Sequence, residues 1–130
     1  MTMSEKEIFV ETMRKRTKQF VLNVIKLYQS FPKSGEYYTI GNQLLRSASS
    51  TGSNYRAVCR ARSDKEFYSK ISIVLEEADE SAFWLEILIE SNLKNDDQTK
   101  ELLKESIELT KIFSKTRSSI GDKIKNNKIN

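Results

Sequence analysis

The stretch that decides the fold runs from Ser47 to Arg62 and reads SASSTGSNYRAVCRAR. On a helical wheel of about 100° per residue it separates into three faces. With the residues just before it, the apolar face holds Leu44, Ala48, Thr51, Tyr55, Val58 and Cys59, the opposite face holds Arg46, Ser49, Ser53, Arg56 and Arg60, and a third strip holds Ser47, Ser50, Asn54, Ala57 and Ala61. An ordinary amphipathic helix needs only two faces. The small strip therefore predicts close approach by a second helix, and the arginine face indicates an anionic partner.

Working outward, apolar periodicity and helix-capping residues predict four helices, over residues of about 5–31, 40–62, 64–92 and 97–125. Capping residues are expected at Ser4 and Ser63, each three residues before a glutamate, and at Thr39 and Asp97. Pro32 ends the first helix, because proline disfavours helical geometry in the residue before it. Gly52, in mid-helix, predicts a close helix contact or a kink.

Short turns between helices of similar length predict an antiparallel, up-down-up-down four-helix bundle. The turn at Ser63 is the shortest, so the helices on either side of it are expected to be antiparallel neighbours. No internal repeat or linker divides the chain, and residues 1–130 are expected to form one all-α domain.

Composition argues against most kinds of active site. The chain has no histidine, which excludes Ser-His-Asp triads, Cys-His nucleophiles and His-ligated zinc. Cys59 is a lone cysteine, and no P-loop or glycine-rich dinucleotide motif is present. The acidic pair Glu76 and Glu80 is better explained by a solvated face, or by ion pairs, than by a metal site. We therefore expect no catalytic residue, no cofactor and no metal.

The chain has no apolar run near 18 residues and no secretory signal at its N-terminus, which predicts a cytoplasmic protein that does not cross a membrane. Its formal net charge of +4 conceals a segregation along the sequence. Residues 63–97 carry three basic and ten acidic side chains, whereas the three other quarters of the chain are each net positive. This pattern has two explanations: charge pairing between neighbouring helices, or a basic face for a polyanion.

The candidate polyanion-binding residues are Arg46, Arg56, Arg60, Arg62 and Lys65. Arginine forks suit phosphates, and Arg56 and Arg60 lie one helical turn apart. Further positive charge is contributed by Lys15, Arg16 and Lys18 in the first helix and by Lys111, Lys115, Arg117, Lys123 and Lys125 in the fourth. No aromatic residue alternates with these cations, so binding should be dominated by phosphate contacts and sensitive to salt. The alternative is that the arginines form salt bridges with third-helix carboxylates.

The third helix has a second apolar side, formed by Ile73, Phe83, Trp84 and Ile87. An outward apolar face that includes a tryptophan surrounded by charge is typical of a protein–protein interface. Self-association through this face is the favoured explanation. The alternative is that a neighbouring helix covers these side chains.

Several short stretches carry a family resemblance: Ser53–Ala57, Cys59–Ser63, Lys65–Phe67, Glu77–Ser81 and Trp84–Glu86. With these motifs the chain resembles a bacterial four-helix-bundle family named for proteins encoded in intervening sequences of 23S ribosomal RNA genes. The resemblance covers about residues 20–120. It implies a bundle that assembles into a ring, typically a homopentamer. A related branch, the accessory protein of diversity-generating retroelements, is a basic pentameric barrel that binds a reverse transcriptase and nucleic acid.

Two hypotheses about function follow. The first is a non-enzymatic, oligomeric bundle that binds RNA, DNA or a nucleic-acid-handling protein, such as a reverse transcriptase, through its basic surface. The second is an assembly or adaptor module whose charges pair between subunits, with no nucleic-acid binding.

Overall fold

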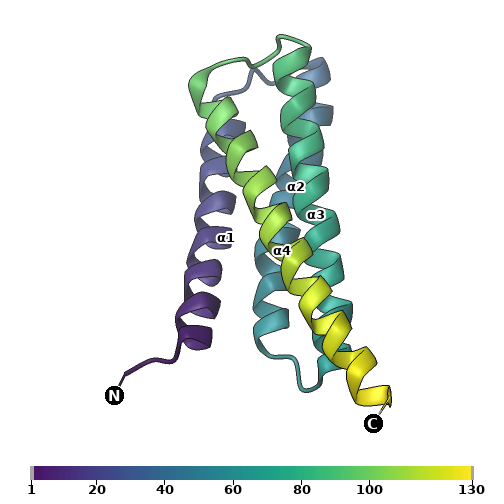
Figure 1. Ribbon diagram of the computed structural model, residues 1–130. Coiled ribbons are helices and arrows are strands. Elements are labelled where there is room, and N and C mark those ends of the chain that lie inside the picture. The colour runs from purple at the N-terminus through teal and green to yellow at the C-terminus, as the bar shows by residue number, and fades with distance from the viewer. Residues whose placement is uncertain (1, 130) are drawn as a thin grey trace.

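Four helices and no strand make up residues 2–129, the part of the chain that the computed structural model describes (Figure 1). They are α1 (Glu5–Gln29), α2 (Gly35–Cys59), α3 (Asp64–Glu90) and α4 (Asp97–Ile129). Consecutive helices run in opposite directions and pack on one another, and α1 also contacts α4. The predicted all-α, antiparallel four-helix bundle is confirmed. None of the described helices combines the length and hydropathy that a bilayer-spanning segment requires.

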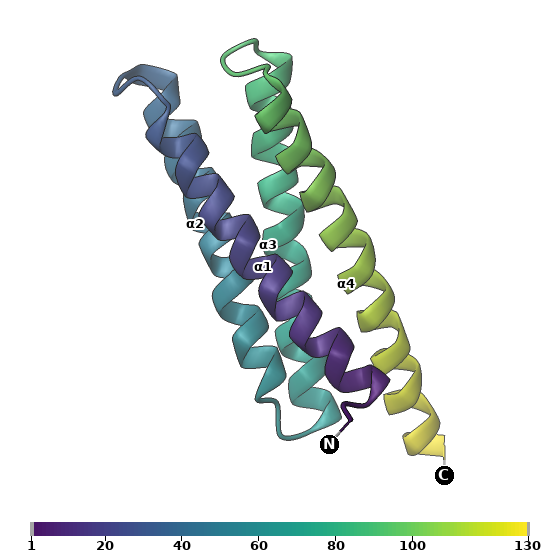
Figure 2. The ribbon, with the colours of Figure 1, turned by 90° about the vertical axis from the view of Figure 1, so that its left-hand side faces the viewer.

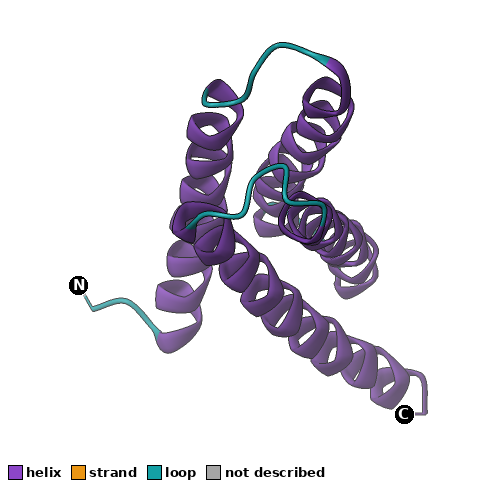
Figure 3. Ribbon diagram, turned by 90° about the horizontal axis from the view of Figure 1, so that it is seen from above, coloured by secondary structure: helices purple, strands orange, loops and turns teal. Residues whose placement is uncertain are grey.

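The helices are not parallel over their whole length. α4 crosses the bundle obliquely, so that its C-terminal half lies far from the N-terminal half of α1 (Figure 1). Viewed from the side, α1 leans across the other helices (Figure 2), and the view from above shows the two chain ends diverging (Figure 3). The end of the bundle that carries both termini and the α2–α3 turn is therefore splayed.

Two of the predicted capping residues begin their helices as expected. The Oγ atoms of Ser4 and Ser63 accept hydrogen bonds from the backbone N–H groups of Glu7 and Glu66, each at 3.1 Å. These bonds satisfy first-turn donors that have no partner inside the helix. Each cap needs only residues three apart in the sequence, and this is why the local pattern predicted it correctly.

The other two predicted caps are wrong. Thr39 lies inside α2, which begins at Gly35, because Gly35 has φ +48°, a left-handed conformation that glycine adopts readily and that turns the chain into the helix early. The cap of α4 is Asp96 and not Asp97: its Oδ1 accepts hydrogen bonds from the N–H and hydroxyl of Thr99, at 2.9 and 2.6 Å. Helix α2 also ends at Cys59, three residues earlier than expected, so Arg62 lies in the turn.

The predicted apolar face of α2 faces the core. Leu44, Tyr55 and Val58 are almost fully buried, and the ring of Tyr55 packs against Phe113 of α4 with centroids 5.5 Å apart. Burial raises the pKa of the Tyr55 hydroxyl, so this group is neutral at physiological pH. The core itself is built from long apolar side chains of all four helices, such as Phe20, Leu44, Ile71, Leu85, Leu109 and Phe113.

Small residues on α2 bring it close to both neighbours. The hydroxyls of Ser47 and of Ser81 in α3 share a hydrogen bond of 2.8 Å in the bundle interior. On the α1 side, a Cβ atom on Gly52 would lie only 2.9 Å from Cγ2 of Val21. The predicted close approach by a second helix is thus confirmed, and Gly52 marks the contact with α1.

Candidate polyanion-binding surface

In the folded bundle, basic side chains gather at one end and acidic side chains at the other. We call residues 2–18, 50–74 and 109–129 the basic half; they form the end with both termini and the α2–α3 turn, at the bottom of Figure 1. This half carries sixteen Lys and Arg side chains against six Asp and Glu. Residues 19–49 and 75–108, the acidic half, carry six basic and twelve acidic side chains. The molecule is therefore an electrostatic dipole along its long axis.

Arg46, on the acidic half of α2, is held in ion pairs. Its guanidinium donates to Glu77 at 3.1 Å and also to Glu80, both on α3. The hydrogen bond to Glu80 is the main cause of a raised Arg46 pKa. Glu80 also accepts a hydrogen bond of 3.2 Å from the indole N–H of Trp84. Arg46 thus fits the salt-bridge alternative.

Arg16 forms the corresponding cluster between α1 and α4, at mid-height in the bundle. Its Nη2 lies 2.6 Å from Glu105 and 3.0 Å from Glu108, and its Nε donates to Glu105 at 3.2 Å. The hydrogen bond to Glu105 is the largest cause of the raised pKa of Arg16. This cation therefore joins two helices rather than lying free for a ligand.

Arg56 and Arg60 have a different environment. Both are exposed, on the face of α2 that the wheel predicts, and neither forms an ion pair with any residue in 2–129. Lys65, at the start of α3, is likewise exposed and unpaired in that range. Arg62 is 89% exposed and lies 3.7 Å from Glu66, a spacing typical of a weak surface pair.

Two shallow grooves flank Arg56. The α1–α2 groove, of about 400 Å³, brings Arg14 and Lys18 of α1 together with Arg56, over a floor that includes Gly52 and Val21. The α2–α3 groove, of about 380 Å³, is lined by Arg56, Arg60, Lys70, Ser53, Ala57 and Glu66. Arg56 belongs to both grooves. Five cations from three helices thus converge on one side of the basic half.

Arg14 has a buried donor atom without a partner within residues 2–129. Its Nε is shielded from solvent and has no hydrogen-bond partner among the described residues, and its only carboxylate neighbour is Glu11 at 3.5 Å. A buried N–H group without an acceptor is costly, and an acceptor entering the α1–α2 groove would relieve that cost.

Arg14 and Lys70 were missed by the sequence analysis, because charge was assessed helix by helix. Folding the sequence back at each turn places residues 14, 18, 56, 60 and 70 at the same bundle end. Comparing the distance of each charged residue from the nearest turn would therefore have revealed the cluster from the sequence.

The predicted interface face of α3 is only partly accessible. Ile73 and Phe83 are 41% and 49% exposed. Trp84 and Ile87 are half-buried and pack against the core, so neighbouring side chains do cover part of them. Phe83 lies edge-on to Trp84, with centroids 4.9 Å apart.

Among residues 2–129 no three His, Cys, Asp or Glu side chains cluster as metal ligands would. Of the acidic pair that sequence analysis weighed as a metal site, Glu80 is ion-paired with Arg46, whereas Glu76 forms no ion pair within residues 2–129.

Comparison with known proteins agrees with the fold. The family model described as 23S rRNA-intervening sequence protein matches residues 12–115. The chain belongs to this family. A protein of unknown function from the S23 ribosomal protein family of Bacteroides thetaiotaomicron VPI-5482 has a similar crystal structure, with a TM-score of 0.76. It is 27% identical, and the match covers 84% of this chain and 97% of that one. No curated protein matches the chain.

The part of the chain matched by the 23S rRNA-intervening sequence protein family includes every residue that lines the two grooves. The lysine-rich end of α4, with Lys123, Lys125 and Lys128, lies beyond the match. The grooves are thus built on the shared bundle, and the α4 extension adds charge to the same half.

Proposed function

We propose that this protein is a non-enzymatic bundle that binds the phosphate backbone of nucleic acid through its basic half. The observation that carries the proposal is the convergence of Arg14, Lys18, Arg56, Arg60 and Lys70 on two adjoining grooves, with Glu66 as the only carboxylate lining either one. A local surplus of cations over carboxylates attracts polyanions over a long range.

The shape of the site favours a sequence-tolerant mode of binding. Arg56 and Arg60 are separated by one helical turn, about 6 Å along the axis, so their guanidinium groups can straddle a backbone phosphate. Neither groove is lined by an aromatic residue on which a base could stack. Contacts to phosphate without base contacts position a nucleic acid but do not read its sequence.

The test is a fluorescence-anisotropy titration of labelled RNA and DNA with purified protein of known mass, from about 50 to about 300 mM salt. We expect micromolar or tighter binding at the low end, similar for unrelated sequences, with affinity falling steeply as salt rises. A folded protein that binds neither nucleic acid at low salt would overturn the proposal.

A second candidate is an assembly or adaptor module. It is favoured by the exposed Ile73 and Phe83 on α3, which lie in the basic and the acidic half respectively, and by the opposite charge of the two halves. In a homo-oligomer the acidic half of one subunit could pair with the basic half of the next, and a ring such as the pentamer that the resemblance implies would use every such face. The environment of the arginines in the oligomer discriminates the two candidates. Arginines paired with carboxylates of a neighbouring subunit support the assembly module. Arginines that face solvent support binding of nucleic acid, including binding together with a reverse-transcriptase-like partner.

A further inference from the structure

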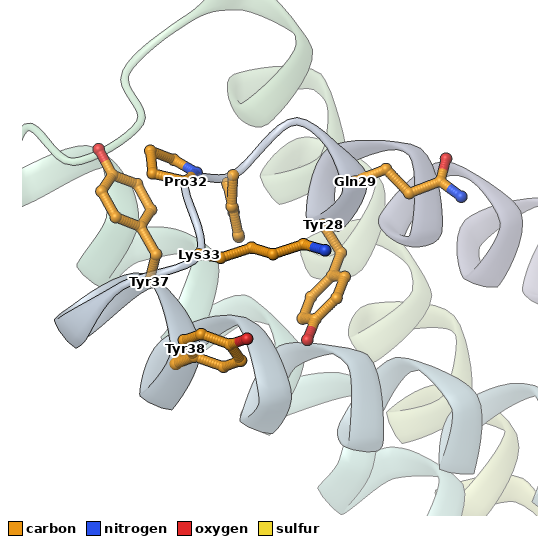
Figure 4. A pocket seen from close by; sticks show the side chains of 7 residues that line it. Tyr28, Gln29, Pro32, Lys33, Tyr37 and Tyr38 are labelled. Carbon is orange, nitrogen blue, oxygen red and sulfur yellow. The ribbon is translucent and has the colours of Figure 1, made fainter.

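An aromatic pocket lies at the α1–α2 turn (Figure 4). This turn is at the top of Figure 1, at the opposite end of the molecule from the basic half. It has a volume of about 360 Å³ and is lined by Tyr28, Gln29, Phe31, Pro32, Lys33, Tyr37 and Tyr38. Four of these seven side chains are aromatic. In Figure 4 the Lys33 side chain extends from the turn toward Tyr28, with Tyr38 below it.

The inner rings are fixed in place. The Tyr28 hydroxyl donates to Asn42 Oδ1 at 2.8 Å, and the Tyr37 hydroxyl donates to the Leu93 carbonyl at 2.7 Å. Phe31 packs between these tyrosines, with centroid distances of 6.3 and 5.4 Å. Because both hydroxyls already have partners, these rings present preorganised aromatic surfaces to a ligand.

Gly41 on α2 permits this arrangement. A Cβ atom at that position would lie 3.1 Å from ring carbons of both Phe31 and Tyr28. Such contacts are tighter than most Cβ atoms make, so the absence of a side chain at Gly41 lets the Phe31 and Tyr28 rings pack directly against the α2 backbone. The pocket thus depends on one backbone contact as well as on its aromatic residues.

The rim, in contrast, has polar groups without partners. Tyr38 is 47% exposed, and within residues 2–129 its hydroxyl forms no hydrogen bond. In the same range Lys33 forms no ion pair, and no acidic side chain lines the pocket. The exposed amide of Gln29 offers both a donor and an acceptor. A ligand that fits has a flat face, hydrogen-bonding edges and one negative charge.

We propose that this pocket binds a nucleotide with an unpaired base. The base stacks on the tyrosine rings, Gln29 and Tyr38 hydrogen-bond to its edges, and Lys33 pairs with the phosphate. A single phosphate suits a rim that carries one cation, Lys33. That the nucleotide belongs to a bound strand rests on the proposed function; binding of a free nucleotide does not.

The experiment is a titration of the wild-type protein with AMP and UMP, in which NMR and calorimetry measure binding. Adenosine serves as the probe that lacks the phosphate, and ribose 5-phosphate as the probe that lacks the base. We expect saturable binding of both nucleotides, with ribose 5-phosphate at least about tenfold weaker because base–aromatic stacking is lost. Tyr38→Ala should weaken AMP binding about tenfold, and Tyr38→Phe, which keeps the ring, by no more than about threefold. Lys33→Ala should reduce the affinity for AMP to that for adenosine.

The Arg56→Glu/Arg60→Glu protein separates this inference from the proposed function. AMP binding that survives in this variant, while binding of long nucleic acids is lost, places the nucleotide in the aromatic pocket and supports both proposals. If wild-type protein binds AMP but no long nucleic acid, the pocket stands and the proposed function fails. The inference is overturned if AMP does not saturate the wild-type protein, or if folded Tyr38→Ala binds AMP as tightly as wild type.

Discussion

The two halves of the bundle use charge in opposite ways. Arg46 in the acidic half and Arg16 at mid-height each meet two carboxylates, with distances of about 3 Å. Arg16 belongs to the basic half, but both of its partners belong to the acidic half. The pairs whose two members both lie in the basic half are longer, 3.5 Å for Arg14 with Glu11 and for Lys123 with Asp64, and 3.7 Å for Arg62 with Glu66. A cation that reaches the carboxylates of the acidic half is thus held in the fold, whereas Arg56 and Arg60, which have no carboxylate partner within residues 2–129, stay available to a binding partner.

The largest expected effect comes from reversing the two unpaired arginines. Arg56→Glu with Arg60→Glu should weaken binding of labelled RNA by about 100-fold or more, because two phosphate contacts are lost and two repulsions gained. The logarithmic salt slope should also fall by about two. The measurement is anisotropy at several salt concentrations, on protein whose helicity and melting temperature match wild type.

The matched control is Lys100→Glu with Lys104→Glu. These lysines are also exposed and one turn apart, and they form no ion pair within residues 2–129, but they lie in the acidic half. The two double variants have the same net charge. Equal losses of binding in both would mean that total charge, and not the grooves, governs attraction, and the contrast between the halves would then have no functional meaning.

The sequence predicted what depends on short spacing and periodicity. The Ser4 and Ser63 caps, the buried Tyr55 and the exposed Arg56 all follow from positions on one helix. The ion pairs of Arg46 could not be predicted in this way, because they depend on how α3 is rotated relative to α2. The aromatic pocket was also invisible, since Tyr28 and Tyr37 converge only after the left-handed Gly35 has turned the chain.

Placing charge on the exposed apolar pair of α3 tests whether this helix contacts a second subunit. Ile73→Glu with Phe83→Glu should dissociate a homo-oligomer that uses this face. In a two-fold dimer the substitutions would bring four like charges into one contact, and in a ring they would bring two into every subunit contact. Light scattering gives the mass, and circular dichroism checks helicity. Trp84→Glu should also lower the mass, but Trp84 packs on the core, so its effect on folding must be separated.

Ile107→Glu is the control for that pair, since Ile107 is 38% exposed on α4, away from the predicted interface. If the wild type is oligomeric and the α3 double variant keeps its mass, the α3 face is not the contact. A monomeric wild type would remove the assembly candidate altogether.

A smaller effect is expected when the mid-height pair is cut. Arg16→Gln should lower the free energy of unfolding by about 1 kcal/mol, because a bidentate, partly buried pair with Glu105 is lost and two carboxylates are left facing each other. Lys18→Gln, two residues on and unpaired within residues 2–129, should change stability by less than about 0.3 kcal/mol. Urea unfolding at low and high salt is the measurement, and the Arg16 effect should shrink as salt rises. Equal effects of the two substitutions would mean that the pair contributes nothing beyond a surface charge.

The smallest effect concerns a carboxylate that serves folding in the acidic half. Hydrogen bonds from the Thr99 hydroxyl and N–H lower the pKa of Asp96. A lowered folded-state pKa means that this stability is fully present above the ordinary carboxyl pKa of about 4 and is lost as pH falls through the folded value. Asp96→Ala should therefore cost about 1 kcal/mol at pH 7, as expected for a lost N-cap, and progressively less in acid.

Asp96→Asn keeps a capping acceptor but cannot titrate, so it should cost less than Asp96→Ala at neutral pH and show no such pH dependence. Asp97→Ala, one residue beyond the cap, should have little effect at any pH. Urea unfolding of the three variants between about pH 3 and pH 7 gives the comparison. An Asp96→Ala penalty that is the same at both ends of this range would show that the cap does not depend on ionisation, and that at this position the acidic half uses Asp96 as a hydrogen-bond acceptor rather than as a charge.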